Sequence, residues 1–259
     1  MIFNSKNLSR GSKGVAVEEL QIRLAGFRGT TWDGDFGPGT ELQVITFQKE
    51  VMKIEDPDGI VGPKVFEALE KFSSDFPIDF EKLKCPCGQC EGFGKGQFKG
   101  QYREVKPEIE AYHLFEYPGI HKAILQSYRA AQFYAQDPDF GPPFLTSGYR
   151  CHVNNKNKGR KSTNHMGKAL DCDFPLKDGE DKRDDSIRCD KFRGKLVEKS
   201  NFQIGWNGRN KKSLEPSNIA STWIHMDVRS FNQEYLLEEF FVTSEEKLDS
   251  NDLKSTRYP

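Results

Sequence analysis

The sequence FLTSGYRCHVNNKNKGRKSTNHMGKALDCDF, residues 144–174, contains His165 followed six residues later by Asp171. Gly167 lies between them and allows a sharp turn. Apolar and acidic residues alternate from 170 to 174, which predicts a strand with one apolar face. On such a strand the carboxylate of Asp171 points toward His165. This stretch is therefore where we expect the chemistry of the protein.

A second element, Trp223-Ile224-His225-Met226-Asp227, follows about fifty residues later. Its alternation predicts a strand that places Trp223, His225 and Asp227 on one face. Together, His165, Asp171 and His225 supply two imidazoles and one carboxylate. Such a mixed nitrogen and oxygen set suits a catalytic Zn²⁺ with one position left open for water.

These residues resemble the zinc D,D-peptidases and L-alanyl-D-glutamate endopeptidases of peptidoglycan, a group that includes many phage endolysins. That family carries S-G-Y-R, then S-x-H-x-x-G-x-A-x-D, then a strand with W-x-H. The chain has SGYR at residues 147–150, TNHMGKALD at 163–171 and WIH at 223–225. The resemblance covers roughly residues 80–240. It implies an α+β catalytic domain, with helices and a small antiparallel sheet of the hedgehog and D,D-peptidase type.

Two departures from the family pattern leave alternatives open. The spacing from histidine to aspartate is one residue shorter than usual, so Asp173 competes with Asp171 as a ligand. We favour Asp171 because it keeps its place relative to Ala169. The family also has an acidic general base three residues before the last histidine, where this chain has Thr222. We expect Asp227, or Glu215 in reserve, to take that role; otherwise the enzyme is impaired.

The S-G-Y-R motif supplies the remaining catalytic and substrate-binding candidates. Arg150 has a rigid fork of donors, and the resemblance implies that it orients the substrate or stabilises charge on the scissile carbonyl. Ser147 and Tyr149 of the same motif are predicted to bind substrate.

The first 75 residues predict a separate helical domain with a weak internal repeat. Two D-G-x-x-G turns, at residues 33–37 and 58–62, each lead directly into a helical pattern. Proline follows each turn, at a position that suits the start of a helix. Three short helices around one apolar centre follow from this pattern. We place the domain boundary at residues 73–77, which read as a short linker between domains 1–75 and 76–259.

The same region is similar to the peptidoglycan-binding module of many wall hydrolases. Residues 33–48 match its pattern D-G-x-x-G-x-x-T-x-x-x-V-x-x-F-Q, and residues 11–24 match G-x-x-G-x-x-V-x-x-L-Q-x-x-L with a one-residue shift. The resemblance implies bacterial peptidoglycan as a partner. The loop residues Trp32 and Asp33 are the candidates for glycan contact. Taken singly, each of them is more typical of a purely structural role in the helical fold.

The chain has six cysteines, and three of them form the cluster Cys85, Cys87 and Cys90. Such a cluster suits a second, structural zinc with a fourth ligand from elsewhere, a disulfide, or unpaired thiols. The spacing matches no standard zinc knuckle, so the alternatives stay open. Among the other histidines, His113, His121 and His152 are weaker candidates for a functional role.

Composition limits the remaining functions. With 38 basic and 39 acidic residues, the charge balance gives no support for a nucleic-acid partner. No segment approaches the roughly 18 apolar residues that span a bilayer, and the N-terminus does not resemble a signal peptide. The resemblance to phage lysins implies a protein made in a host cytoplasm that reaches the wall after the membrane is permeabilised. We expect it to be a monomer. An endopeptidase is the favoured function, with a D-Ala-D-Ala carboxypeptidase or a catalytically impaired wall-binding protein as alternatives.

Overall fold

The computed structural model describes residues 7–30, 32–95, 116–160, 162–207, 210–228 and 236–250. The helices within these ranges are α1 (Val15–Arg23), α2 (Pro38–Glu50), α3 (Pro63–Asp75), α4 (Phe80–Leu83), α6 (Lys122–Tyr134), α7 (His152–Asn157), α8 (Lys182–Lys199), η2 (Glu238–Phe240) and α9 (Glu245–Asp249). The strands are β1 (Ile120–His121), β2 (Phe144–Ser147), β3 (Ala169–Asp173), β4 (Trp206–Asn207), β5 (Asn210–Lys211), β6 (Ile224–Asp227) and β7 (Phe241–Val242).

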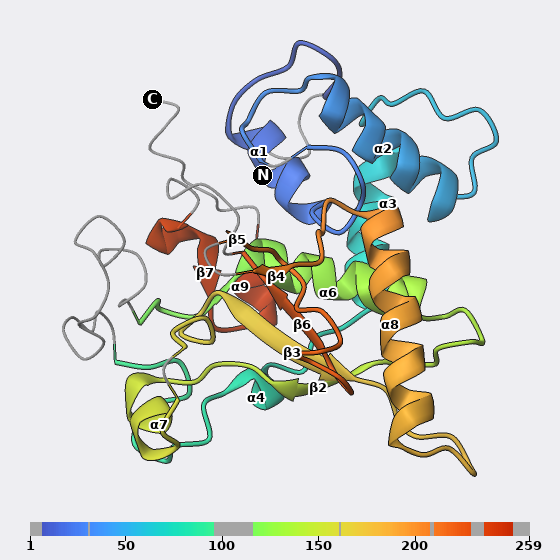
Figure 1. Ribbon diagram of the computed structural model, residues 1–259. Helices are drawn as coiled ribbons and strands as arrows, with labels where there is room; N and C mark the ends of the chain where they lie inside the picture. Colours follow the sequence, from blue (N-terminus) through green and yellow to red (C-terminus); the bar gives the residue numbers. More distant parts are fainter. Residues whose placement is uncertain are drawn as a thin grey trace.

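The N-terminal region is helical, as the repeat predicts. Helices α2 and α3 each begin with a proline, Pro38 and Pro63, directly after a glycine. Proline has no N–H to leave unsatisfied at this position, and its fixed φ suits the first turn of a helix. These helices and α1 lie together at one end of the molecule, blue to cyan in Figure 1.

A buried glutamine holds each of the two repeated turns. Gln21 on α1 accepts a hydrogen bond from the backbone N–H of Asp33 and donates one to the Asp33 carboxylate, both at 2.8 Å. Gln48 on α2 accepts from the N–H of Gly59 at 2.9 Å and donates to the Asp58 carboxylate at 2.6 Å. The glutamines of the L-Q and F-Q motifs, Gln21 and Gln48, therefore have a structural role. Each one holds a turn through its side-chain hydrogen bonds.

The rest of the chain combines helices with a small antiparallel sheet of order β2-β3-β6. Figure 1 shows this sheet in the lower half, with α7 to its left and α8 to its right. The strand pattern of residues 170–174 is confirmed, because Leu170, Cys172 and Phe174 are all buried. Strands β1 and β7 form a separate antiparallel pair. This mixture agrees with the α+β class expected for this part of the chain.

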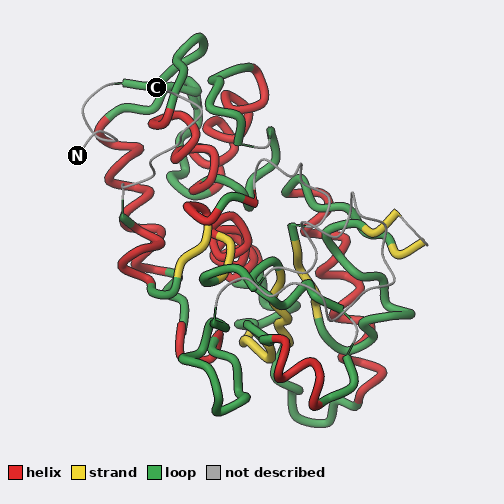
Figure 2. Tube along the Cα trace, turned by 90° about the vertical axis from the view of Figure 1, so that its left-hand side faces the viewer, coloured by secondary structure: helices red, strands yellow, loops and turns green. Residues whose placement is uncertain are grey.

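The helical and the sheet-containing regions share one continuous hydrophobic core. Helix α6 contacts α1, and it lies between the N-terminal helices and the sheet in Figure 1. At this junction the ring of Phe27 lies within 6.4 Å, centroid to centroid, of four others: Phe47, Phe72, Phe133 and Tyr134. The rotated view of Figure 2 shows helices (red) on both sides of short strands (yellow) near the centre of the molecule. The core therefore continues across the boundary expected from the sequence.

Residues 73–75, which the sequence analysis assigned to a linker, are the last residues of α3. The side chain of Arg129 on α6 is fully buried against this helix end. It donates hydrogen bonds to the Ser73 hydroxyl at 3.0 Å and to the backbone carbonyl of Phe76 at 3.2 Å. It also pairs with Asp249 on α9. This packing explains why the segment continues the helix although its sequence is polar.

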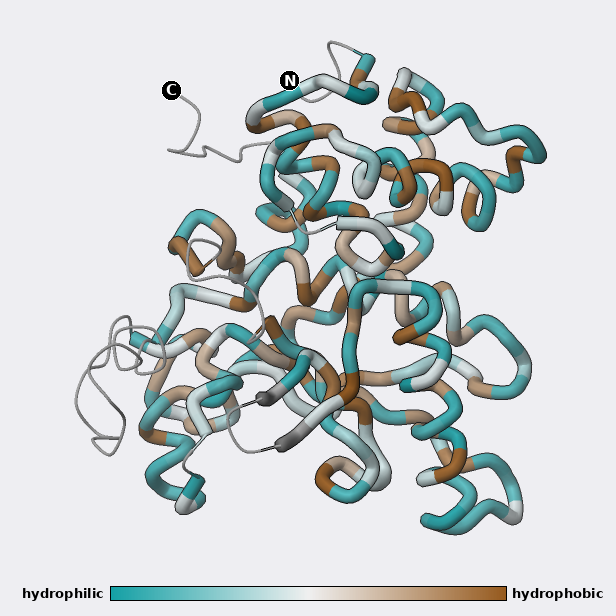
Figure 3. The backbone as a smooth tube through the Cα atoms, turned by 45° about the horizontal axis from the view of Figure 1, so that its top comes forward, coloured by the Kyte–Doolittle hydropathy of each residue, from teal (hydrophilic) through white to brown (hydrophobic). Residues whose placement is uncertain are grey.

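Hydrophobic (brown) and hydrophilic (teal) stretches are interspersed along the described parts of the chain (Figure 3). Among the described residues, no helix is both long enough and apolar enough to cross a membrane.

Candidate active site

The structure brings His165, Asp171 and His225 together. One potential ligand atom from each lies within 4.8 Å of the other two, and all three side chains are buried. The Oδ1 atom of Asp171 lies 3.3 Å from Nε2 of His165 and 2.7 Å from Nδ1 of His225. For comparison, ligands at about 2.0–2.1 Å from a tetrahedral Zn²⁺ are about 3.3 Å apart. The donor set therefore fits a zinc ion after small movements.

The antiparallel pairing of β3 with β6 brings Asp171 and His225 together. Asp171 stands directly opposite His225 in the register, so both side chains point to the same face. His165 comes from the tight loop before β3, in which Gly167 has a φ of +111°. A Cβ at Gly167 would lie 2.6 Å from the backbone oxygen of Gly119. Only glycine fits this turn, which brings His165 back over the strand.

Hydrogen bonds on the outer side of each imidazole fix which nitrogen faces Asp171. Nδ1 of His165 lies 2.8 Å from the carbonyl oxygen of Gly148, which can only accept, so this nitrogen carries the proton. Nε2 of His225 lies 2.9 Å from Oδ2 of Asp227. Such outer partners orient metal-binding histidines and leave the inner nitrogen free to ligate.

Burial and mutual contacts shift the pKa values of all three side chains in this cluster. Burial disfavours the imidazolium form of His225, but hydrogen bonds to Asp171 and Asp227 outweigh it and raise the pKa of His225 to about 9. Burial lowers the pKa of His165. Burial also favours the neutral form of Asp171, yet the two imidazoles hold its pKa well below the usual range. The site therefore keeps an ionised carboxylate between two histidines.

A cavity of about 400 Å³ opens over this cluster, within the range of small-molecule sites. Its lining is formed by Thr146, Ser147, Arg150, Ser162, His165, Asp171, Asp173, Glu215, Thr222, Trp223 and His225.

Of the two aspartates considered as metal ligands, Asp171 lies with the two histidines and Asp173 does not. Asp173 lines the cavity, but its Oδ1 accepts a hydrogen bond from the N–H of Phe174 at 2.7 Å. Its potential metal partners are Asp185 and Cys189, whereas Asp171 groups with the two histidines. The shorter histidine-to-aspartate spacing therefore leaves Asp171 in the central position.

Asp227 lies outside the cavity lining, in contrast to its expected role as general base. Its side chain is fully buried on the outer edge of the His225 ring. It also accepts a hydrogen bond from the side-chain amide of Asn164 at 3.1 Å. An aspartate held in this way positions His225. Asn164 is a positioning residue that the sequence analysis missed, although it directly precedes His165.

Glu215, the reserve candidate for the base, does line the cavity. Its Oε1 lies 3.9 Å from Nε2 of His225, and its side chain is 12% exposed. Thr222, which occupies the family's usual position for the base, lines the same cavity. The structure thus supplies a carboxylate at the cavity from the preceding loop.

The S-G-Y-R motif divides into two groups of residues. Ser147 and Arg150 line the cavity, and Nε of Arg150 donates to the Ser147 hydroxyl at 2.7 Å. Nη2 of Arg150 also donates to Oδ2 of Asp171 at 2.6 Å. Tyr149, expected to bind substrate, is instead fully buried, and its hydroxyl donates to the backbone oxygen of Tyr117 at 2.7 Å. Its ring packs against that of Phe93 in the core, away from the cavity lining.

The candidate glycan contacts also have structural partners. Trp32 is only 2% exposed and packs against the ring of His121, so a wall polymer cannot reach it in this arrangement. Asp33 is exposed, and Gln21 holds its carboxylate as described above.

Neither His121 nor His152, the other two histidines among the described residues, joins the cluster. Nδ1 of His121 accepts from the N–H of Ala123 and caps α6, and His152 pairs with Glu116. His113 lies outside the described residues.

Comparison with known proteins adds two similarities. Residues 13–69 match the family described as a peptidoglycan binding domain. The zinc D-Ala-D-Ala carboxypeptidase of Streptomyces albus G is 42% identical over 82 residues, which cover 29% of this chain and 31% of the relative. The chain thus spans less than a third of that relative's length. Its N-terminal region is similar to peptidoglycan binding domains, and the chain shares a stretch of sequence with a zinc peptidase.

Proposed function

We propose that the protein is a zinc peptidase that cleaves stem-peptide amides of bacterial peptidoglycan. The convergence of His165, Asp171 and His225 beneath an open cavity carries this proposal. The similarity to a peptidoglycan binding domain supports peptidoglycan as the partner. The shared stretch with a zinc D-Ala-D-Ala carboxypeptidase supports the peptide as the target and zinc as the metal.

Three side chains would hold the metal: His165 through Nε2, Asp171 through Oδ1 and His225 through Nδ1. When bound, zinc lowers the pKa of a water molecule toward about 7 and polarises a carbonyl oxygen. Gly148 and Asp227 keep the two imidazoles in the orientation that this requires.

The chain's own residues would carry the proton and the developing charge. Glu215 lines the cavity as a carboxylate, so it accepts the proton of the attacking water and passes it to the leaving amine. Arg150 presents its guanidinium to the same cavity, where it binds a substrate carbonyl or carboxylate. Ser147 and Asp171 hold that guanidinium in place.

We favour an endopeptidase, in a D,D-peptidase-like fold of two domains, 1–75 and 76–259. The protein would act as a monomeric phage endolysin that reaches the wall after the membrane is permeabilised. The second candidate is a D-Ala-D-Ala carboxypeptidase, which the shared stretch with the Streptomyces enzyme favours equally.

Mass spectrometry of peptidoglycan digests tests the proposal and separates the two candidates. An endopeptidase releases new amino groups on stem-peptide fragments, whereas a carboxypeptidase releases free D-alanine. Either activity should disappear with a chelator or in His165→Ala and return when zinc is added back to the wild type. The matched control is His152→Gln, a histidine outside the cluster, which should keep its activity. Binding to peptidoglycan without any peptide product would overturn the proposal.

A further inference from the structure

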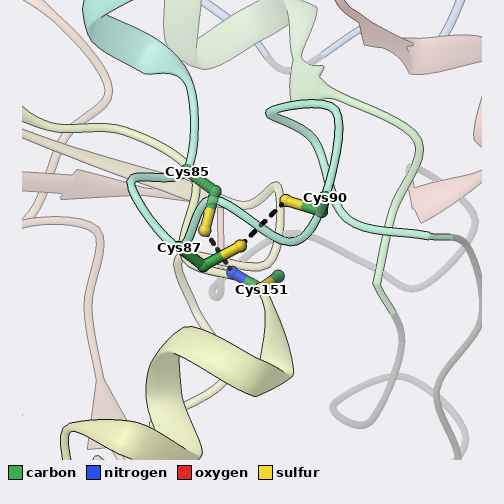
Figure 4. A group of neighbouring side chains, drawn as sticks. All are labelled: Cys85, Cys87, Cys90 and Cys151. Atoms are coloured by element: carbon green, nitrogen blue, oxygen red, sulfur yellow. Dashed lines mark hydrogen bonds between the residues drawn. The ribbon is translucent and has the colours of Figure 1, made fainter.

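Four cysteines converge about a single point at the edge of the sheet-containing region. The Sγ atoms of Cys85, Cys87, Cys90 and Cys151 all lie within 4.8 Å of one another. Three come from the loop after α4, and the fourth precedes α7, 61 residues after Cys90 in the sequence. Figure 4 shows the side chains directed toward one another.

We propose that these four thiolates bind a structural zinc ion, separate from the candidate active site. Tetrahedral zinc with Zn–S distances of about 2.3 Å separates its sulfur ligands by about 3.8 Å. The Cys87 and Cys90 sulfurs are 3.4 Å apart, close to that spacing and well beyond the roughly 2.05 Å of a disulfide. Cys151 supplies the fourth ligand that the sequence alone did not identify.

Backbone N–H groups already point at three of the sulfurs. The N–H of Cys151 donates to Cys85 at 3.3 Å, that of Gln89 to Cys87 at 3.3 Å, and that of Asn154 to Cys151 at 3.4 Å. Such donors stabilise thiolate charge and orient the ligands of metal sites.

The loop that carries three of the cysteines is folded back on itself. Gly88 and Gly92 have positive φ values of 67° and 106°, and the N–H of Cys85 donates to the carbonyl of Gly92 at 2.7 Å. Its described residues, 84–95, contain turns and bends but no helix or strand to hold them. All four ligands come from the protein, so this site is closed, as structural zinc sites are.

The proposed site would position the catalytic motif. Cys151 directly follows Arg150, and the backbone N–H of Tyr149 donates to the carbonyl of Leu83 at 2.7 Å. The metal would therefore fix the loop against the segment that carries Arg150 and the Gly148 carbonyl. That carbonyl in turn holds His165.

Zinc content measured in a variant without the active-site ligands tests this proposal separately from the proposed function. The double variant His165→Ala/His225→Ala, purified as the full chain, should retain one zinc ion per molecule. Adding Cys87→Ser and Cys90→Ser should remove that ion. Adding Cys172→Ala instead, a buried thiol of β3 outside the cluster, should leave it bound. A double variant without zinc, or a zinc content unchanged by the cysteine substitutions, would overturn the proposal.

Two further measurements keep the test decisive if the serine variants do not fold. The variant Cys90→His should keep the ion, because three cysteines and one histidine also form structural zinc sites. In the folded double variant, alkylation followed by mass spectrometry should find the four thiols protected until a chelator is added. An intact mass lower by four hydrogens would show two disulfides and contradict the proposal.

Discussion

At the scale of single residues, the carboxylates of Glu215 and Asp227 near His225 lie in different surroundings, and we propose different roles for them. Glu215 lines the cavity, whereas Asp227 lies buried at the outer edge of the imidazole. We expect Glu215→Gln to lower turnover roughly 100- to 10,000-fold, as the loss of a general base does, with the zinc content unchanged. Steady-state kinetics on stem peptides, with metal analysis of the same sample, measures both effects.

The matched substitution Asp227→Asn should act through the metal instead. Loss of an outer partner of a histidine ligand typically weakens metal binding about 10- to 100-fold. Excess zinc should therefore restore much of its activity, which it cannot do for Glu215→Gln. An inactive Asp227→Asn with full zinc content, beside an active Glu215→Gln, would reverse the two assignments.

A second residue-scale prediction concerns the glutamines of the repeated turns. Gln21→Ala removes the acceptor of the Asp33 and Gly34 N–H groups, both at 2.8 Å. Because unsatisfied backbone groups are costly, the free energy of unfolding should fall by on the order of 2 kcal/mol. For a chain of this size the melting temperature should fall by roughly 4–8 °C. The control is Gln132→Ala on α6, which removes a half-buried side chain with one long, exposed hydrogen bond to the Pro77 carbonyl at 3.4 Å. It should change the melting temperature little. Equal shifts in both variants would contradict this account.

At the scale of secondary-structure elements, the end of β2 packs closely against the end of α4 and so fixes the position of the S-G-Y-R segment. A Cβ added at Gly148 would lie 2.4 Å from the backbone oxygen of Leu83. Gly148→Ala should therefore displace the segment that carries Arg150 and lower both the melting temperature and the turnover. Gly194→Ala on α8 has open space around its added methyl group and should be neutral or slightly stabilising. Thermal melts and kinetics of the pair measure the difference, and a Gly148→Ala enzyme with wild-type values would contradict the account.

The secondary-structure elements also show which parts of the fold can be predicted from the sequence alone. Alternation correctly predicted β3 and β6, because each strand has one face in the core. The metal cluster follows from those strands together with the glycine loop. The polar end of α3 was assigned to a linker, since its stabilising partner Arg129 lies more than fifty residues away. Cys151 was missed for the same reason. Contacts between distant segments are invisible to local patterns.

At the scale of the whole molecule, the shared core predicts that the two regions unfold together. Phe27 is fully buried where the N-terminal helices meet α6, and Gly26 approaches α6 so closely that a Cβ would lie 2.2 Å from that of Ala130. Calorimetry should therefore show one transition for the full chain. Phe27→Ala should lower that single transition, with a loss of about 3–5 kcal/mol typical of such core truncations. Two separate transitions in the wild type would show that the regions fold independently.

The packing of the N-terminal helices against α6 fixes the orientation of the N-terminal region relative to the cavity. A module that is similar to peptidoglycan binding domains is thus held at a set distance from the candidate active site, rather than at the end of a flexible linker. Its position would limit which stem peptides of a bound wall polymer reach the cavity.

The location of the metal is the most direct test of the central claim. Crystals of the zinc-loaded protein, measured at the zinc absorption edge, give an anomalous difference map that places each ion. We predict a peak about 2.0–2.2 Å from Nε2 of His165, Oδ1 of Asp171 and Nδ1 of His225. A zinc-loaded crystal with no peak among these three atoms would contradict the account.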